Sequence, residues 1–279
     1  MDLRRYSPSQ LQVIAAMGAL NYQPFILSDN VQTGVAYSWL HSNDPRDDRF
    51  WKFVFRRNAL PADIWDKAAD ANARLRAMYD DFVAEIARRY PGGSLLDVAC
   101  NNGYFPVRAE QLGMRGCAGM DRRPQHWAAI KTLNNITGTS VEFLNRAYSP
   151  ETHKAEVGKR YDVVVASAIM CHLPDPLNFL AFLGSVPTEA VFFWGQMLDT
   201  DDYLVAYSEP NRLGFNNRPF PYGFDDNTRL SRGLFRKSVE LMGFGNIVEL
   251  PYRDTWLPAD WYRPHRAWLC MREENPGRP

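Results

Sequence analysis

The chain has 279 residues, and its 32 Lys and Arg side chains balance 32 Asp and Glu side chains, so the formal net charge is zero. A protein that grips a long phosphate backbone usually carries a basic surplus, and this balance favours a neutral or small partner over nucleic acid. No stretch reaches the roughly 18 consecutive apolar residues that a membrane-spanning helix needs.

Two further features concern the cellular compartment. The N-terminal residues lack the apolar core of a signal peptide. The four cysteines are scattered, without metal-binding spacing. We therefore expect free thiols in a cytoplasmic protein, and no metal site.

Residues 1–60 are irregular in pattern and rich in aromatic side chains. Two interpretations stay open for them: an extension that packs over one face of a sheet, or a lid whose aromatic side chains close over a substrate. Pro61 begins a clear amphipathic helix, which Pro91-Gly92-Gly93 ends. The expected domains are therefore an N-terminal extension, 1–60, and an α/β domain, 61–279.

From Ser94 onward, short apolar runs alternate with amphipathic segments, which predicts a mostly parallel sheet with helices on both faces. The predicted strands are seven: 95–99, 116–120, 141–144, 161–167, 190–194, 246–250 and 267–271. The predicted helices between them are 105–112, 124–136, 176–183 and 227–242. Residues 198–226 break the rhythm and predict an inserted substrate cap after the fifth strand.

Two acids end the first two predicted strands of this sheet. Asp97 is followed by a polar turn and Gly103, and a parallel sheet places ligands at such strand ends. Asn101-Asn102-Gly103 lacks two glycines of the dinucleotide fingerprint, which argues against NAD or FAD. Asp121 is placed to accept hydrogen bonds from ribose hydroxyls; the alternative is an ordinary acid that precedes a helix.

The segment 167–176 follows the fourth strand and carries His172. A histidine titrates near neutral pH, so at this sheet edge it can orient a substrate or act as a base. The alternative is a structural histidine that hydrogen-bonds the loop.

The segment 95–105 resembles the first motif of class I S-adenosylmethionine-dependent methyltransferases, and Asp121 resembles their ribose-binding acid. Segments 161–165 and 171–176 are similar to their fourth-strand region. The resemblance implies a Rossmann-like methyltransferase fold over about 94–271 and S-adenosylmethionine as the cofactor. It implies these cofactor-binding residues: Asp97, Ala99, Cys100, Asn101, Gly103, Tyr104, Phe105, Asp121, Arg122, Arg146, Ser167 and Ala168.

The sequence departs from the family pattern at three places. Ala99 and Asn101 stand where the family usually has glycine, and 145–147 lacks the acid that many relatives place near the adenine. A narrower likeness, carried by 172–176 and Asn216-Asn217, is to the tRNA wobble-uridine methyltransferase-like group. Some members of that group use a carboxylated cofactor, for which Arg212 and Arg218 are candidate ligands.

Methyl transfer is a direct displacement, so the enzyme mainly aligns the acceptor and excludes water. Candidate catalytic or acceptor-positioning residues are His172, Trp194, Gln196, Glu209, Asn211 and Arg212. For any single charged residue of 198–226, the alternative is a solvated cap surface.

Three functions stay open. The neutral charge and the aromatic-rich cap favour methyl transfer to a small molecule, such as a specialised metabolite or a sugar. The second is methyl or carboxymethyl transfer to a tRNA wobble uridine. The third is a non-catalytic, cofactor-binding accessory protein.

Overall fold

A computed structural model describes residues 1–4, 6–7, 23–32, 55–56, 62–146, 159–173, 175–207, 228–257 and 265–273. The chain divides into two compact units. The first comprises Met1–Gly92, Cys100–Arg146 and Tyr252–Pro258, and the second comprises Gly93–Ala99, Ala147–Pro251 and Ala259–Pro279.

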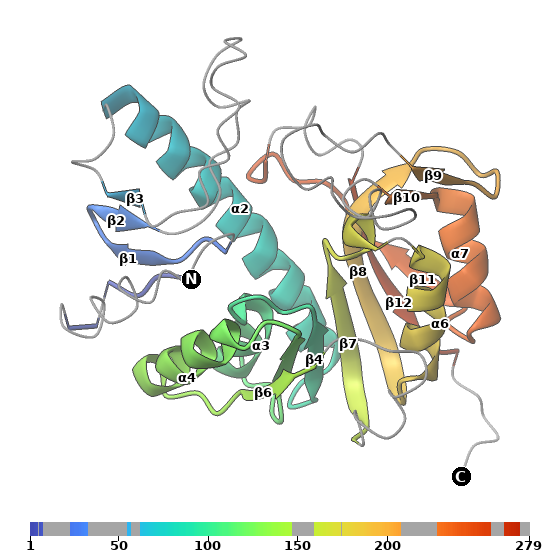
Figure 1. The fold of residues 1–279 in the computed structure, drawn as a ribbon, viewed down its shortest axis with the longest axis horizontal. Coiled ribbons are helices and arrows are strands. Elements are labelled where there is room, and N and C mark those ends of the chain that lie inside the picture. Colours follow the sequence, from blue (N-terminus) through green and yellow to red (C-terminus); the bar gives the residue numbers. More distant parts are fainter. Residues whose placement is uncertain are drawn as a thin grey trace. The chain divides into compact units, whose positions relative to one another are not determined.

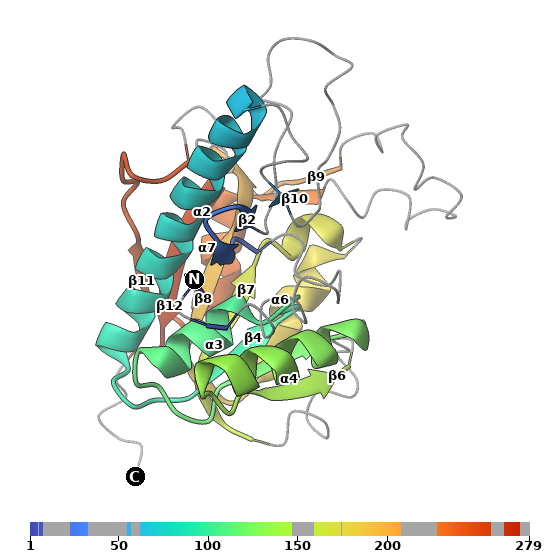
Figure 2. The same cartoon turned by 90° about the vertical axis from the view of Figure 1, so that its left-hand side faces the viewer.

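The first unit holds three helices and five strands among its described residues. The helices are α2 (Ala62–Arg89), α3 (Tyr104–Gln111) and α4 (Gln125–Thr137). β5 (Ala118–Asp121) and β6 (Glu142–Asn145) are parallel, with Asp121 opposite Asn145. A small antiparallel sheet is formed by β1 (Ile26–Ser28), β2 (Val31–Gln32) and β3 (Phe55–Arg56). In Figures 1 and 2, α3 and α4 lie beside one another.

The core of the first unit follows from the helical period of α2. Its apolar residues recur at spacings of three and four, and Leu75, Met78, Phe82 and Ile86 are all buried. The Phe82 ring packs against Trp256, whose indole nitrogen donates a 2.7 Å hydrogen bond to Asp81. Trp256, which is far from α2 in the sequence, therefore covers part of the apolar face of α2.

The second unit is a sheet with strand order β11-β12-β8-β7-β4. β4 (Leu95–Val98), β7 (Tyr161–Ser167) and β8 (Thr188–Leu198) are parallel. The closing strands, β12 (His265–Met271) and β11 (Asn246–Glu249), are each antiparallel to their neighbour. The continuous apolar run in β7 is fully buried, as expected of a parallel strand covered on both faces.

Two helices cover the second unit's sheet. α6 (Pro176–Ser185) and α7 (Arg232–Leu241) lie beside one another (Figure 1). Phe235 of α7 packs 4.6 Å from the Phe193 ring of β8 and 4.9 Å from the Trp268 ring of β12. A short 3-10 helix, η4 (Met170–His172), follows β7. With β5 and β6 of the first unit, these strands provide the seven that the sequence predicts.

The fifth predicted strand, 190–194, is longer than predicted, since β8 continues to Leu198, and the predicted start of the last helix is wrong. Thr228–Ser231 forms a strand, β10, rather than the first turn of a helix, because it pairs parallel to β8 and antiparallel to β9 (Val205–Tyr207). α7 begins only at Arg232, where the Ser231 hydroxyl accepts from Leu234 N at 3.2 Å and caps the helix. Tertiary pairing overrides the local helical pattern here.

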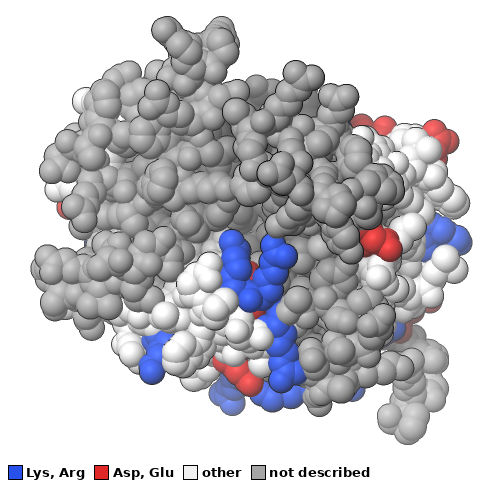
Figure 3. Space-filling view, viewed as in Figure 1, with Lys and Arg blue, Asp and Glu red and all other residues white. Residues whose placement is uncertain are grey.

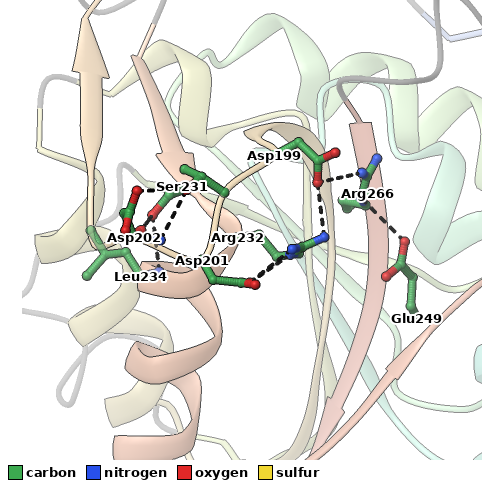
Figure 4. A network of polar contacts seen from close by, with 9 residues as sticks. Asp199, Asp201, Asp202, Ser231, Arg232, Leu234, Glu249 and Arg266 are labelled. Carbon is green, nitrogen blue, oxygen red and sulfur yellow. Dashed lines mark hydrogen bonds and ion pairs between the residues drawn. The ribbon is translucent and has the colours of Figure 1, made fainter.

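The residues after β8 are tied down by a network of ion pairs (Figure 4). Arg232 lies 3.0 Å from both Asp199 and Asp201, and Arg266 of β12 bridges Asp199 at 3.2 Å and Glu249 at 3.4 Å. Further along, Tyr207 of β9 lies opposite Thr228 of β10. The β9–β10 ladder therefore holds the two ends of 208–227 together, although 208–227 itself lies outside the described residues.

Most of 1–60 also lies outside the described residues, so its interpretation as a packing extension or a lid stays a prediction. Among the described residues, no disulfide joins Cys100, Cys117, Cys171 or Cys270. Among the described residues, no helix is both long and apolar enough to cross a membrane.

Candidate cofactor site and strand-end residues

The turn that follows β4 has an unusual backbone. Ala99, Asn101 and Gly103 have φ values of 62°, 52° and 78°. A Cβ at Gly103 would lie 2.7 Å from Ile130 Cγ1, so only glycine fits there. Ala99 and Asn101, which replace the family's usual glycines, still adopt the left-handed conformation that glycine favours, at a cost of roughly 1–2 kcal/mol each. The backbone path of a glycine-rich turn is therefore kept.

Asp121 ties the end of β5 to this turn. Its carboxylate is 5% exposed and accepts from Asn101 N at 3.1 Å and from Arg123 N at 2.9 Å. Arg123 Nε completes an ion pair at 3.3 Å. The main-chain carbonyl of Asp121 accepts from Arg146 N at 3.0 Å, which places Arg146 at the end of β6. The side chains of Arg122 and Arg146 are exposed.

His126 lies in the first turn of α4 and contacts the loop that follows β4 through Asn102. Its Nδ1 lies 2.9 Å from Asn102 Oδ1. Because an amide oxygen only accepts, Nδ1 carries the hydrogen and Nε2 is an acceptor. Burial lowers the pKa of His126 from 6.5 to about 4, so the ring is neutral at pH 7.

Gln23 connects the turn to the N-terminal part of the chain. Its Nε2 donates to Cys100 O at 3.0 Å, and its Oε1 accepts from Tyr104 N at 3.0 Å. The Tyr104 and Phe105 rings pack 5.6 Å and 5.1 Å from Tyr79 of α2. The Cys100 thiol is buried against Gly119, where an added Cβ would lie 2.6 Å from the sulfur. The side chains of the predicted site residues Cys100, Tyr104 and Phe105 thus pack in the core. In the turn itself, Cys100 and Tyr104 use main-chain groups.

The second unit holds the other predicted residues. Asp97 is buried at the end of β4, opposite Val165 of β7. Ser167 and the half-buried Ala168, which has φ 52°, follow on β7 and just after it. Ala168 N donates to Trp194 O at 2.7 Å, which joins the end of β7 to the interior of β8, since β8 continues to Leu198.

Trp194 is buried and stacks on His265, with ring centroids 5.3 Å apart and planes 14° apart. Gln196 is exposed and lies opposite His265 in the β8–β12 register. His172 is exposed in η4. Glu209, Asn211, Arg212 and Arg218 lie outside the described residues. In the described ranges, no group of three His, Cys, Asp or Glu side chains is placed to hold a metal.

Comparison with known proteins identifies the family. Residues 71–222, more than half of the chain, match the family model described as "Methyltransferase domain". The chain belongs to this family. The predicted class I S-adenosylmethionine-dependent methyltransferase is thereby confirmed at the level of the family.

Two curated relatives are similar in sequence to this methyltransferase. A ubiquinone biosynthesis O-methyltransferase of Aliivibrio fischeri (strain MJ11) is 30% identical over 188 residues, 63% of this chain and 76% of the relative. A tRNA U34 carboxymethyltransferase of Nautilia profundicola is 27% identical over 86 residues, 31% of this chain and 28% of the relative.

The likeness to two solved structures concerns the fold. The N-terminal domain of EvdMO1 with SAH bound has a TM-score of 0.53 at 18% identity, covering 70% of this chain and 81% of that one. The magnesium protoporphyrin IX methyltransferase of Synechocystis PCC 6803 has a TM-score of 0.50 at 15% identity, covering 74% and 87%. The predicted Rossmann-like fold is confirmed.

The first unit of this methyltransferase fits a ligand that donates hydrogen bonds. Asn101 Oδ1 and His126 Nε2 are buried without a partner among the described residues, and the Asp121 carboxylate is a third acceptor. The first amide of α3, Tyr104 N, already donates to Gln23 Oε1. It therefore does not serve as the phosphate-binding amide that many helix N-termini provide. The ribose diol and the ammonium group of S-adenosylmethionine are donors and match this set.

Sequence reasoning missed five residues that the structure brings to these sites: Gln23, Asn102, Arg123, His126 and His265. Arg123 and His126 lie within five residues of Asp121 in the sequence. Basic side chains that closely follow an acid at a strand end could therefore have been predicted as site residues. Gln23 and His265 lie far from the motifs, and nothing in their local sequence marks them.

Proposed function

We propose that the chain transfers the methyl group of S-adenosylmethionine to a hydroxyl group of a small-molecule acceptor. The bound cofactor supplies a methyl carbon on a sulfonium, which is attacked directly. The observation that carries the proposal is the set of buried acceptors, Asp121, Asn101 and His126, around one glycine-dependent turn.

In this proposal the chain's own residues have distinct tasks. Asp121, already oriented by Asn101 N and Arg123, accepts from the ribose hydroxyls. A hydroxyl acceptor must lose a proton, and His172 is our candidate base because it is an exposed histidine directly after β7. Trp194 and His265 are both buried and stack on one another, so in this proposal they hold β8 and β12 together.

The small, neutral acceptor is supported by charge. Figure 3 shows basic side chains gathered near the centre of the described part of one face, with acidic side chains close by. Over the whole chain the two signs are equal in number. The Aliivibrio relative, named an O-methyltransferase, aligns over 76% of its length and supports oxygen as the methylated atom.

The experiment measures cofactor binding first. Isothermal titration with S-adenosylhomocysteine should give binding to the wild-type chain, and Asp121→Ala should weaken it by roughly 1–3 kcal/mol, the cost of unpaired hydroxyls. Asp70→Ala is the matched control, because that acid pairs with Arg74 on the exposed face of α2. Equal affinity of wild type and Asp121→Ala would show that the acid has another role.

Turnover is measured next, with methyl-labelled cofactor and a metabolite extract. A product formed with carbon-13 methyl cofactor whose methyl signal in the NMR spectrum is that of a methyl ether, rather than of a methylamine or a C-methyl group, supports transfer to a hydroxyl. Cofactor binding without label transfer to any acceptor would favour the accessory protein instead.

A second candidate function, methyl or carboxymethyl transfer to a tRNA wobble uridine, is favoured by the Nautilia relative, although the alignment spans only 31% of this chain. Binding to bulk tRNA that weakens steeply with salt would support it, since phosphate contacts release counterions. An absence of tRNA binding at low salt would exclude it. Mass spectrometry of a co-purified ligand would distinguish the ordinary from the carboxylated cofactor.

A further inference from the structure

Gln23 carries a buried amide that bridges the two ends of the turn between β4 and α3, residues 99–103. We call this segment the cofactor turn, since we propose that it binds the cofactor. The side chain is 7% exposed, and its partners, Cys100 O and Tyr104 N, lie 77 and 81 residues further along the chain. Both hydrogen bonds are 3.0 Å long. One amide group thus uses its donor on the beginning of the turn and its acceptor on the end.

The bond to Tyr104 N replaces a helix cap that α3 does not have. The N-cap residue is Gly103, which offers no side chain to the free amides of the first turn. Gln23 Oε1 satisfies the first of these amides from outside the helix. The start of α3, and with it the position of Gly103, therefore depends on a residue of another segment.

The segment that carries Gln23 is held against the same helix. The Phe25 ring packs 5.3 Å from the Tyr104 ring, and Phe25 and Leu27 are buried. Tyr104 also donates from its hydroxyl to Asp80 of α2 at 3.1 Å. These contacts fix the Gln23 main chain relative to α3, so the amide holds the turn at a set spacing.

Asn101 is the residue within this bridged turn that contacts Asp121. Its N–H donates to the Asp121 carboxylate, and its own Oδ1 is one of the buried acceptors. If the ends of the turn separate, the Asn101 main chain rotates and both acceptors lose their orientation. The effect of Gln23 on a ligand would thus be indirect.

We propose that Gln23 is a positioning residue for cofactor binding. Its two hydrogen bonds hold Cys100 O and Tyr104 N at a fixed separation and thereby orient the turn that binds the cofactor. The inference rests on the proposed function, since it takes the ligand of this turn to be S-adenosylmethionine. It assigns a binding role to a part of the N-terminal segment, through the turn and without contact to the cofactor itself.

The test compares two variants of Gln23 with one control by titration with S-adenosylhomocysteine. Gln23→Met keeps the length and apolar volume but loses both hydrogen bonds, and the dissociation constant should rise about tenfold or more because two buried main-chain groups lose their partner. Gln111→Met is the control: it makes the same chemical change at the last residue of α3, away from the turn. It should bind as wild type does.

Gln23→Glu provides a readout that a merely structural role does not move. Its carboxylate still accepts from Tyr104 N but repels Cys100 O, whereas the protonated acid can donate to that carbonyl. The affinity of Gln23→Glu should therefore recover toward the wild-type value as the pH falls, while Gln23→Met shows no such recovery. This pH profile also decides the question if Gln23→Met does not fold.

The outcomes separate the two proposals. Wild-type affinity in both Gln23 variants, together with a weakened Asp121→Ala, would overturn the positioning role and leave the proposed function standing. A lower melting temperature of the Gln23 variants with unchanged affinity would likewise overturn it. A wild-type chain that does not bind S-adenosylhomocysteine would remove the proposed function, and the role of Gln23 with it.

Discussion

The turn after β4, which we propose binds the cofactor, and the exposed polar residues of the second unit differ in how their side chains are engaged. Around the turn, Asp121, His126 and Gln23 are buried and engaged in hydrogen bonds to the main chain or to neighbouring side chains. In the second unit, His172 of η4 and Gln196 of β8 are exposed. Substitutions at the turn should therefore change stability and cofactor affinity together, whereas substitutions of His172 and Gln196 should change turnover with little effect on folding.

The largest expected effect tests the second half of this comparison. His172→Ala should lower the rate of methyl transfer about 10²–10⁴-fold if the imidazole is the base. As an exposed position, it should change the free energy of unfolding by no more than about 0.5 kcal/mol. Single-turnover kinetics and urea unfolding measure the two quantities. Equal losses of turnover and cofactor affinity would make His172 structural.

Gly103→Ala tests how tightly the turn is packed. The added methyl group meets Ile130 and sits at a φ of 78°, so the free energy of unfolding should fall by roughly 2–4 kcal/mol. Gly138→Ala is the matched control, because it has a φ of 68° and nothing within 4 Å of the added Cβ. Chemical denaturation of both variants isolates the packing contribution; equal losses would contradict the close approach of Ile130.

His126 predicts how the stability of the chain depends on pH. Its pKa is about 4 in the folded chain against 6.5 for an unperturbed histidine, so the unfolded chain takes up the proton first. The free energy of unfolding should therefore fall as the pH drops from about 6.5 to 4, by at most about 3 kcal/mol. His126→Gln should flatten this part of the profile, because the substituted side chain does not titrate. An unchanged profile in His126→Gln would refute the assignment.

The smallest effect concerns the residues that replace glycine. Ala99→Gly relieves a positive φ but increases the freedom of the unfolded chain, so it should raise the free energy of unfolding by no more than about 1 kcal/mol. Ala109→Gly, in the middle of α3, should instead lower it by about 1 kcal/mol. If Ala99→Gly destabilises the chain as Ala109→Gly does, the Ala99 methyl group contributes packing that outweighs the strain.

Periodicity and strand-end position predict the features that depend on nearby sequence. The helical period of α2, the apolar run of β7 and the placement of Asp121 at the end of β5 all follow from local patterns. The interaction of Gln23 with Cys100 and the stacking of His265 on Trp194 join distant segments, and no local pattern encodes them. For the same reason the local pattern wrongly predicts a helix at Thr228–Ser231, since the pairing of this segment with β8 and β9 is a property of the tertiary structure.

The β9–β10 ladder has a consequence for how such an enzyme can diversify. Because Tyr207 and Thr228 are paired, the residues that flank 208–227 lie next to one another. The entropic cost of holding the two ends of a loop together grows only slowly with the length of the loop. Residues 208–227 can therefore be exchanged for a shorter or longer sequence at little thermodynamic cost to the sheet. We therefore predict that exchanging this segment between relatives changes the choice of acceptor and leaves the affinity for S-adenosylhomocysteine unchanged.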